Sequence, residues 1–146
     1  MNTDKGQFKY QQLTERIIGV FYEVYNEIGY GFLESVYEKC FVVALRQNGI
    51  ATEQQVPIPF YFRGAPLADF SADLLAERKV LIEIKTCKAL ERAHEAQLLN
   101  YLRATEIEVG LLLNFGERPQ VRRLIFDNER KKHRGSPEQS DAASAG

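Results

Sequence analysis

Val80-Leu81-Ile82-Glu83-Ile84-Lys85 is an apolar stretch, typical of a buried strand, that carries two charged side chains. Successive side chains of a strand point to opposite faces, so Glu83 and Lys85 share one face and Ile82 and Ile84 share the other. A carboxylate and an ammonium are costly in such a segment unless they are paired, solvated in a cleft or bound to a ligand. A cross-strand salt bridge on a solvated sheet face is an equally good explanation of this strand taken alone.

The tripeptide Glu-x-Lys occurs three times in the chain. The copies at Glu77-Arg78-Lys79 and Glu129-Arg130-Lys131 lie in charged segments typical of turns or tails, where a solvated surface explains them fully. Only the copy at residues 83–85 interrupts an apolar strand, so only this copy is a candidate site.

Asp73 lies in a second short strand, residues 68–75, and the charged residues 77–79 between the two strands favour a hairpin. A three-residue loop places Asp73 opposite Glu83 on the same face, whereas an even-numbered loop would separate them unless a bulge restored the register. Two facing carboxylates repel each other unless a cation lies between them. Carboxylate oxygens, completed by water and phosphate, are typical ligands of Mg²⁺ or Mn²⁺. The pattern predicts phosphodiester hydrolysis by a metal-activated water. Lys85 would orient this water, deprotonate it, or stabilise the charge that develops on the phosphate.

The rest of the chain predicts an α/β fold, a small mixed sheet flanked by helices, in the order α-α-β-β-β-α-β-β. Apolar residues at helical spacing predict three helices, and short apolar runs predict the strands. The expected helices span residues 11–28, 32–47 and 90–104, and the remaining strands span residues 56–62, 109–114 and 121–126. We expect one domain over residues 11–127, a flexible N-terminus over residues 1–10 and a disordered polar tail over residues 128–146.

Three polar residues of the expected helices are weaker candidates. Gln97 and Tyr101 stand four residues apart on one helix face, where an amide and a phenol could contact a nucleic-acid strand. A tyrosine at the boundary between helix and sheet, with its hydroxyl in water, is at least as common. Glu34 lies near the start of the second helix, where a glutamate often only complements the helix dipole. We expect His94 to be a surface residue or a neighbour of the site.

Bulk composition excludes more than it identifies. The 146 residues fit one domain, and a formal net charge of −1 gives no global argument for binding nucleic acid. Cys40 and Cys87 form no disulfide framework or zinc motif, and a reducing compartment suits them better. No apolar run approaches the length of a membrane span, and no signal peptide is evident, so we expect a cytoplasmic protein without a membrane partner.

Five short segments follow one another in order within residues 10–127: Gly31-Phe32-Leu33-Glu34-Ser35-Val36-Tyr37, Ser71-Ala72-Asp73-Leu74-Leu75, Glu83-Ile84-Lys85, Ala96-Gln97-Leu98-Leu99-Asn100-Tyr101-Leu102 and Gly110-Leu111-Leu112-Leu113-Asn114-Phe115-Gly116. Each segment is a weak signal, but the set in this order is specific. In this set the chain resembles the bacterial GxxExxY protein family, a branch of the PD-(D/E)XK nuclease superfamily.

The resemblance implies a metal-dependent nuclease with Mg²⁺ or Mn²⁺ as cofactor and nucleic acid as substrate. Of the two nucleic acids we favour DNA over RNA, although the sequence does not distinguish them. The resemblance implies that Asp73 and Glu83 are metal ligands and that Lys85 is the catalytic lysine. It also promotes Glu34 to a third metal ligand, because it matches the helical glutamate of superfamily members that have one. Gln97 and Tyr101 match the Q-x-x-x-Y motif of one branch. Ala72 stands where the superfamily name has proline, a position at which members often differ.

Other functions remain open at this stage. The same fold serves as a catalytically inactive nucleic-acid-binding or accessory module, and the sequence also leaves room for a plain interaction domain and for a homo-oligomer. A dinucleotide site at Gly29-x-Gly31 is rejected, because the preceding segment is helical in pattern and Glu34 stands where a third glycine is needed. Arg122-Arg123 and the basic residues 130–134 form a local basic cluster that could contact phosphates, but a solvated tail is the better explanation.

Overall fold

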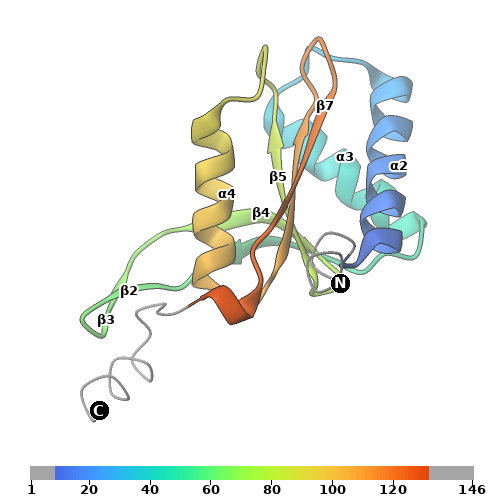
Figure 1. The fold of residues 1–146 in the computed structure, drawn as a ribbon. Coiled ribbons are helices and arrows are strands. Elements are labelled where there is room, and N and C mark those ends of the chain that lie inside the picture. The colour runs from blue at the N-terminus through green and yellow to red at the C-terminus, as the bar shows by residue number, and fades with distance from the viewer. Residues whose placement is uncertain (1–8, 132–146) are drawn as a thin grey trace.

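The computed structural model describes residues 9–131, which form a five-stranded mixed sheet covered by helices on both faces (Figure 1). The sheet order is β1-β4-β5-β6-β7, in which β5 and β6 are parallel and all other neighbours are antiparallel. The strands are β1 (Thr52–Pro57), β4 (Ser71–Ala76), β5 (Val80–Lys85), β6 (Val109–Asn114) and β7 (Gln120–Ile125). A separate two-stranded hairpin consists of β2 (Phe60–Phe62) and β3 (Ala65–Leu67).

Two apolar cores lie on the two faces of the sheet. Helices α2 (Gln11–Ile28) and α3 (Glu34–Gln47) pack on one face, where Phe21, Phe41 and Phe115 are fully buried. Helix α4 (Arg92–Ala104) covers the other face with Leu98 and Leu102 and also connects the parallel strands β5 and β6. This arrangement confirms the α/β class, with three helices and a mixed sheet. None of the helices within residues 9–131 has both the length and the apolar composition to cross a membrane.

The β4–β5 hairpin has the three-residue loop that places Asp73 opposite Glu83. Ala76 pairs with Val80, and the register continues to the pair of Leu74 with Ile82. The loop residues Glu77 and Arg78 adopt positive φ angles of 52° and 55°. Backbone and side-chain hydrogen bonds between Glu77 and Ala51, at 2.7 and 2.6 Å, hold this turn against the chain that enters β1.

The segment between α3 and β5 contains two more strands than the expected order α-α-β-β-β-α-β-β. The expected strand over residues 56–62 is wrong in its bounds, because Pro57 and Pro59 interrupt it and divide it between β1 and β2. The expected strand over residues 68–75 is divided in the same way, since Asp69 has a φ of 66° between β3 and β4.

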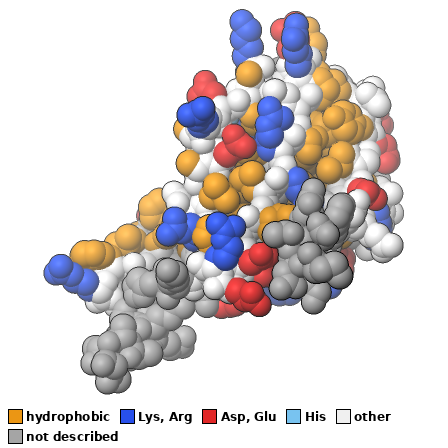
Figure 2. Space-filling view, viewed as in Figure 1, with side chains coloured by type: hydrophobic (Ala, Val, Ile, Leu, Met, Phe, Trp, Pro, Cys, Tyr) orange, Lys and Arg blue, Asp and Glu red, His pale blue; other side chains and the backbone are white. Residues whose placement is uncertain are grey.

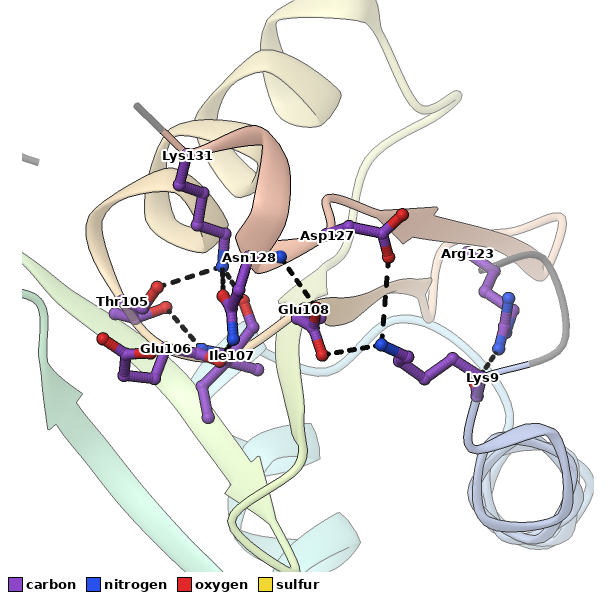
Figure 3. Close-up of polar contacts among 9 residues, drawn as sticks. All are labelled: Lys9, Thr105, Glu106, Ile107, Glu108, Arg123, Asp127, Asn128 and Lys131. Carbon is purple, nitrogen blue, oxygen red and sulfur yellow. Dashed lines mark hydrogen bonds and ion pairs between the residues drawn. The ribbon is translucent and has the colours of Figure 1, made fainter. Parts of the chain in front are cut away.

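A polar network extends the folded body beyond the expected boundary at residue 127 (Figure 3). Asn128–Arg130 form a 3-10 helix, and the Asn128 amide donates to Glu108 at 2.7 Å. The Lys131 ammonium donates to the carbonyls of Thr105 and Ile107. Residues 128–131 therefore belong to the domain; the predictions for residues 1–8 and 132–146 lie outside the described residues.

Candidate active site

Strands β4 and β5 separate at the two carboxylates that the sequence singles out. Beyond the pair of Leu74 with Ile82, β4 stays paired with β1 and β5 stays paired with β6. The Asp73 amide donates to Oε2 of Glu83 at 3.0 Å, and the Ile84 amide donates to Oδ2 of Asp73 at 2.7 Å. Side-chain carboxylates thus accept the N–H groups that a continuous ladder would direct at carbonyls. We call this place, formed by Asp73, Glu83 and Ile84, the fork.

The Glu83 carboxyl is buried, with 4% of the residue exposed. Burial, the charge of Asp73 and a hydrogen bond with that carboxyl raise the pKa of Glu83 to about 8, although the hydrogen bond from the Asp73 amide and the Lys85 charge act in the opposite direction. These surroundings favour the protonated form of the Glu83 carboxyl. A carboxyl in this setting can exchange its proton for a bound cation.

Lys85 ends β5 on the same face as Glu83 and is half-buried. Its carbonyl accepts a hydrogen bond from Phe115 at 2.8 Å, and its charge acts on both Glu83 and Glu34. Within residues 9–131, Lys85 forms no ion pair with Glu83. A solvated surface salt bridge, the alternative for this strand, therefore does not describe it.

Buried Asn114 fixes the loop that follows Lys85. Its Oδ1 accepts the amides of Cys87 and Gly116, both at 3.0 Å, and its Nδ2 donates to the Cys87 carbonyl at 2.9 Å and to Oε1 of Gln120 at 3.1 Å. A Cβ at Gly116 would lie 2.1 Å from the Cys87 carbonyl oxygen, so only glycine fits there. The sequence predicts Asn114 only as the end of the strand over residues 109–114 and does not reveal this role. The available signal was a polar residue that ends the apolar run of residues 109–113.

Tyr101 and Gln97 approach the fork from α4. The Gln97 amide donates to the Tyr101 hydroxyl at 3.0 Å, and Tyr101 is 5% exposed. Burial raises the pKa of Tyr101, the Gln97 hydrogen bond opposes this, and the charges of Glu83 and Asp73 raise it further. The hydroxyl therefore lies near both carboxyls of the fork and is not simply a solvated group at the helix edge.

His94 helps to begin α4. Its Nδ1 accepts the Glu91 amide at 2.9 Å, while the Glu91 side chain accepts the His94 amide, which forms a capping box. The half-buried imidazole also acts electrostatically on Glu34, so His94 is a neighbour of the site as well as a helix cap.

Glu34 is the first residue of α3, and its position depends on Tyr37. The Tyr37 hydroxyl donates to the Gly29 carbonyl at 2.5 Å and accepts the Phe32 amide at 3.3 Å, which holds the loop that leads into α3. Gly31 in this loop has a φ of 110°, a conformation that strongly favours glycine. This geometry gives a physical reason for the spacing of glycine, glutamate and tyrosine in residues 31–37.

The Glu34 carboxylate is exposed, yet it interacts electrostatically with the fork. Partial burial raises its pKa, the Lys85 charge lowers it, and the Asp73 charge raises it again. Glu34, Asp73, Glu83 and Lys85 therefore lie in one neighbourhood, to which three different elements contribute.

Gln55 of β1 links this strand to α3 and to the start of β4, a role that sequence reasoning missed. Gln55 lies where β1 would pair with Asp73, but it has a φ of 49° and is skipped in the β1–β4 register. Its amide donates to both carboxylate oxygens of Glu38 at 3.0 Å, and its Oε1 accepts the Ser71 hydroxyl at 3.0 Å. A glutamine in this strained conformation has no signature in the sequence.

The carboxyl oxygens at the fork are suitable ligands for a small divalent cation, but they do not supply a complete coordination shell. Mg²⁺ commonly binds one or two carboxylates and completes its shell with water and phosphate, which matches the pair Asp73 and Glu83. Within residues 9–131, no three histidine, cysteine, aspartate or glutamate side chains form a group that could hold a metal ion. The role of Glu34 as a third ligand stays a prediction.

A comparison with protein families places this geometry in context. The family model described as the PD-(D/E)XK nuclease superfamily matches residues 11–124. The match runs from the first residue of α2 almost to the end of β7 and includes every residue of the site. No curated protein and no solved structure matches the chain.

Proposed function

The chain belongs to the PD-(D/E)XK nuclease superfamily, and we propose that it is a metal-dependent nuclease that cuts phosphodiester bonds of nucleic acid, preferably DNA, at the fork. The observation that carries this proposal is the pair of crossed hydrogen bonds between Asp73 and the strand of Glu83. They hold two carboxyls together where the sheet opens, with Lys85 two residues further along the same strand.

Asp73 and Glu83 would hold Mg²⁺ or Mn²⁺, with Glu34 as a further ligand. When bound, such a cation polarises the phosphate and lowers the pKa of a coordinated water. The Lys85 ammonium lies beside these carboxyls, where it would orient the attacking water and stabilise the charge that develops on the phosphate. The Tyr101 hydroxyl and the Gln97 amide would position the nucleic-acid strand.

We assign the chain to the GxxExxY branch of the superfamily as part of the same proposal. The support is the connection of Gly31, Glu34 and Tyr37 through a single loop, in which Tyr37 holds the backbone and Glu34 faces the site. The free thiols of Cys40 and Cys87 favour a reducing compartment such as the cytoplasm.

A catalytically inactive nucleic-acid-binding module is the second candidate. It is favoured by the observation that residues 9–131 contain no group of three side chains ready to hold a metal. Such a module would bind nucleic acid without cutting it, whatever divalent cation is supplied.

A nuclease assay with a matched lysine control separates the two candidates. Wild type, Lys85→Ala, Asp73→Ala and Lys79→Ala are incubated with single- and double-stranded DNA and RNA in Mg²⁺, Mn²⁺ or EDTA. Lys79 belongs to another Glu-x-Lys copy, in the exposed loop of the same hairpin. We expect cleavage by wild type and Lys79→Ala only, and none in EDTA, while circular dichroism shows all four proteins folded.

Two outcomes would reject the proposal. Cleavage that survives Lys85→Ala would point to a different site, and binding without cleavage in both metals would identify the inactive module.

A further inference from the structure

The β2–β3 hairpin, with its flanking residues 58–70, forms an arm that extends from the body of the molecule (Figure 1). Its apolar side chains are unusually exposed: Phe62 by 61%, Leu67 by 49% and Phe70 by 43%. Figure 2 shows hydrophobic side chains along this arm and a basic group near its tip, where Arg63 begins the turn. The Arg63 guanidinium lies 5.0 Å from the centre of the Phe62 ring. Exposed aromatic surface of this kind marks a binding site more often than it serves stability.

Aromatic rings connect the arm to the fork. The ring centre of Phe60 lies 6.1 Å from that of Tyr101, whose hydroxyl is influenced by Asp73 and Glu83. The Phe60 ring also packs edge-on against Phe70, with 5.0 Å between centres. A strand of nucleic acid that leaves the fork along Tyr101 would therefore next meet the exposed ring of Phe70.

A hollow of about 610 Å³ lies beside Phe70, at the base of the arm. It is bordered by Pro57, Pro59, Leu67, Asp69 and Ser71 as well as by Phe70 itself. Ser71 precedes Asp73 by two residues of β4, a separation of roughly 6–7 Å, which is comparable to one nucleotide of an extended strand. The hollow is thus within reach of the nucleotide next to the bond that is cut.

The chemistry of the hollow suits a nucleobase better than a phosphate. Its described lining has one carboxylate, Asp69, and no lysine or arginine, so a phosphate would be repelled. A base can stack on the ring of Phe70 and donate an N–H or amino hydrogen to Asp69.

We propose that this hollow binds an unpaired base of the strand being cut, stacked on Phe70 and hydrogen-bonded to Asp69, so that the protein prefers single-stranded nucleic acid. This inference rests on the proposed function, because it supposes that the fork acts on nucleic acid. Paired bases are excluded by their partners and by stacking in the duplex. Arg63 at the tip of the arm supplies a cation for a phosphate further along the strand.

The test measures binding apart from cleavage. Fluorescence anisotropy with the full-length chain in EDTA follows a labelled single-stranded DNA oligonucleotide and a duplex of the same sequence. Phe70→Ala should weaken binding of the single strand by about 5- to 100-fold, since stacking on one aromatic ring contributes that much. Phe70→Tyr should retain binding, and Asp69→Asn should change the preference among homopolymers of the four bases.

Tyr22→Ala is the matched control. Tyr22 is a 40% exposed aromatic residue of α2, on the face of the sheet opposite α4. We expect this variant to bind as wild type does, and thermal melting of each variant checks that the fold is retained.

The outcomes separate this inference from the proposed function. Equal binding by Phe70→Ala and Tyr22→Ala, an equal loss for single strand and duplex, or no binding by wild type would overturn the role of the hollow. If Mg²⁺-dependent cleavage persists in that case, the proposed function stands without it. If binding depends on Phe70 but neither Mg²⁺ nor Mn²⁺ permits cleavage, the hollow stands and hydrolysis is rejected.

Discussion

Glu83 lies in β5 and Glu108 directly precedes β6, and the surroundings of these two carboxyls shift their pKa values in opposite directions. Burial by itself would raise the pKa of Glu108, but hydrogen bonds from Asn128 and from the Lys9 ammonium, at 2.7 and 2.9 Å, lower it (Figure 3). At the fork, burial and the neighbouring Asp73 raise the pKa of Glu83 to about 8. The Lys9 ammonium forms an ion pair with Glu108 at 2.9 Å, whereas within residues 9–131 neither Asp73 nor Glu83 forms an ion pair. The difference distinguishes a structural carboxylate from one suited to bind a ligand.

The largest expected difference between the two residues concerns cleavage. Glu83→Gln should reduce the rate by at least about 10²–10³-fold, because it removes one of the two carboxyls that would hold the cation at the reacting centre. Glu108→Gln should leave the rate within about twofold of wild type, because its partners are Lys9 and Asn128, which lie outside the site. Single-turnover cleavage of a labelled oligonucleotide measures the rates of both variants. Similar losses in the two variants would mean that Glu83 and Glu108 do not differ in function.

The pH dependence of stability should reveal the proton held by Glu83. Between about pH 4.5 and pH 8 the folded chain retains a proton that the unfolded chain has lost, so this group lowers the free energy of unfolding as pH rises. Urea unfolding in EDTA across this range measures the slope, which should be shallower in Glu83→Gln. A slope unchanged by the substitution would mean that Glu83 does not hold the proton.

The contribution of Glu108 to the free energy of unfolding should change with pH in the opposite direction. Its lowered pKa stabilises the folded chain above the unfolded value near 4.5, and this contribution is lost as pH falls through the folded value. At pH 7, Glu108→Gln should destabilise the chain by about 1–3 kcal/mol, because the charged partner of two hydrogen bonds is removed. Chemical unfolding at pH 7 and pH 3 measures the effect, and a loss of similar size at both pH values would argue against the ion pair.

A smaller effect is expected from Lys131, at the edge of the same network. Lys131→Ala removes hydrogen bonds to the carbonyls of Thr105 and Ile107 and should lower the free energy of unfolding by about 0.5–1.5 kcal/mol. Lys88→Ala, an exposed lysine at the other end of the molecule, is the control and should have little effect. If the two variants melt alike, the Lys131 contacts contribute nothing to the stability of the domain.

The parts of the fold that sequence analysis predicts are those with a strong local pattern. The bounds of α2 and β6 are predicted to the residue, because an apolar stripe and an apolar run define them. The three-residue loop at 77–79 gives the register that brings Asp73 to Glu83. By contrast, β1 begins with Thr52-Glu53-Gln54-Gln55, an edge segment whose mostly exposed polar side chains give no strand signal.

The residues of the site likewise fall into those that the sequence reveals and those that it does not. Asp73, Glu83 and Lys85 are found because they interrupt apolar strands within a short hairpin. Asn114 and Gln55 act through partners distant in sequence, so their roles appear only once the fold is known. The arm is a similar case, because its exposure depends on where two prolines and Asp69 direct the chain.

The Asn114 contacts also have a consequence for the order of folding. The two carboxyls of the fork come from a hairpin whose partners are ten residues apart, so they can meet through a short and fast loop closure. The contacts that fix the chain after Lys85 join residues 27 apart and require α4 and the parallel strand β6. We therefore expect the fork to assemble early and the loop after Lys85 to become ordered late, so that a nascent chain acquires its acidic pair before the chain around Lys85 is fixed.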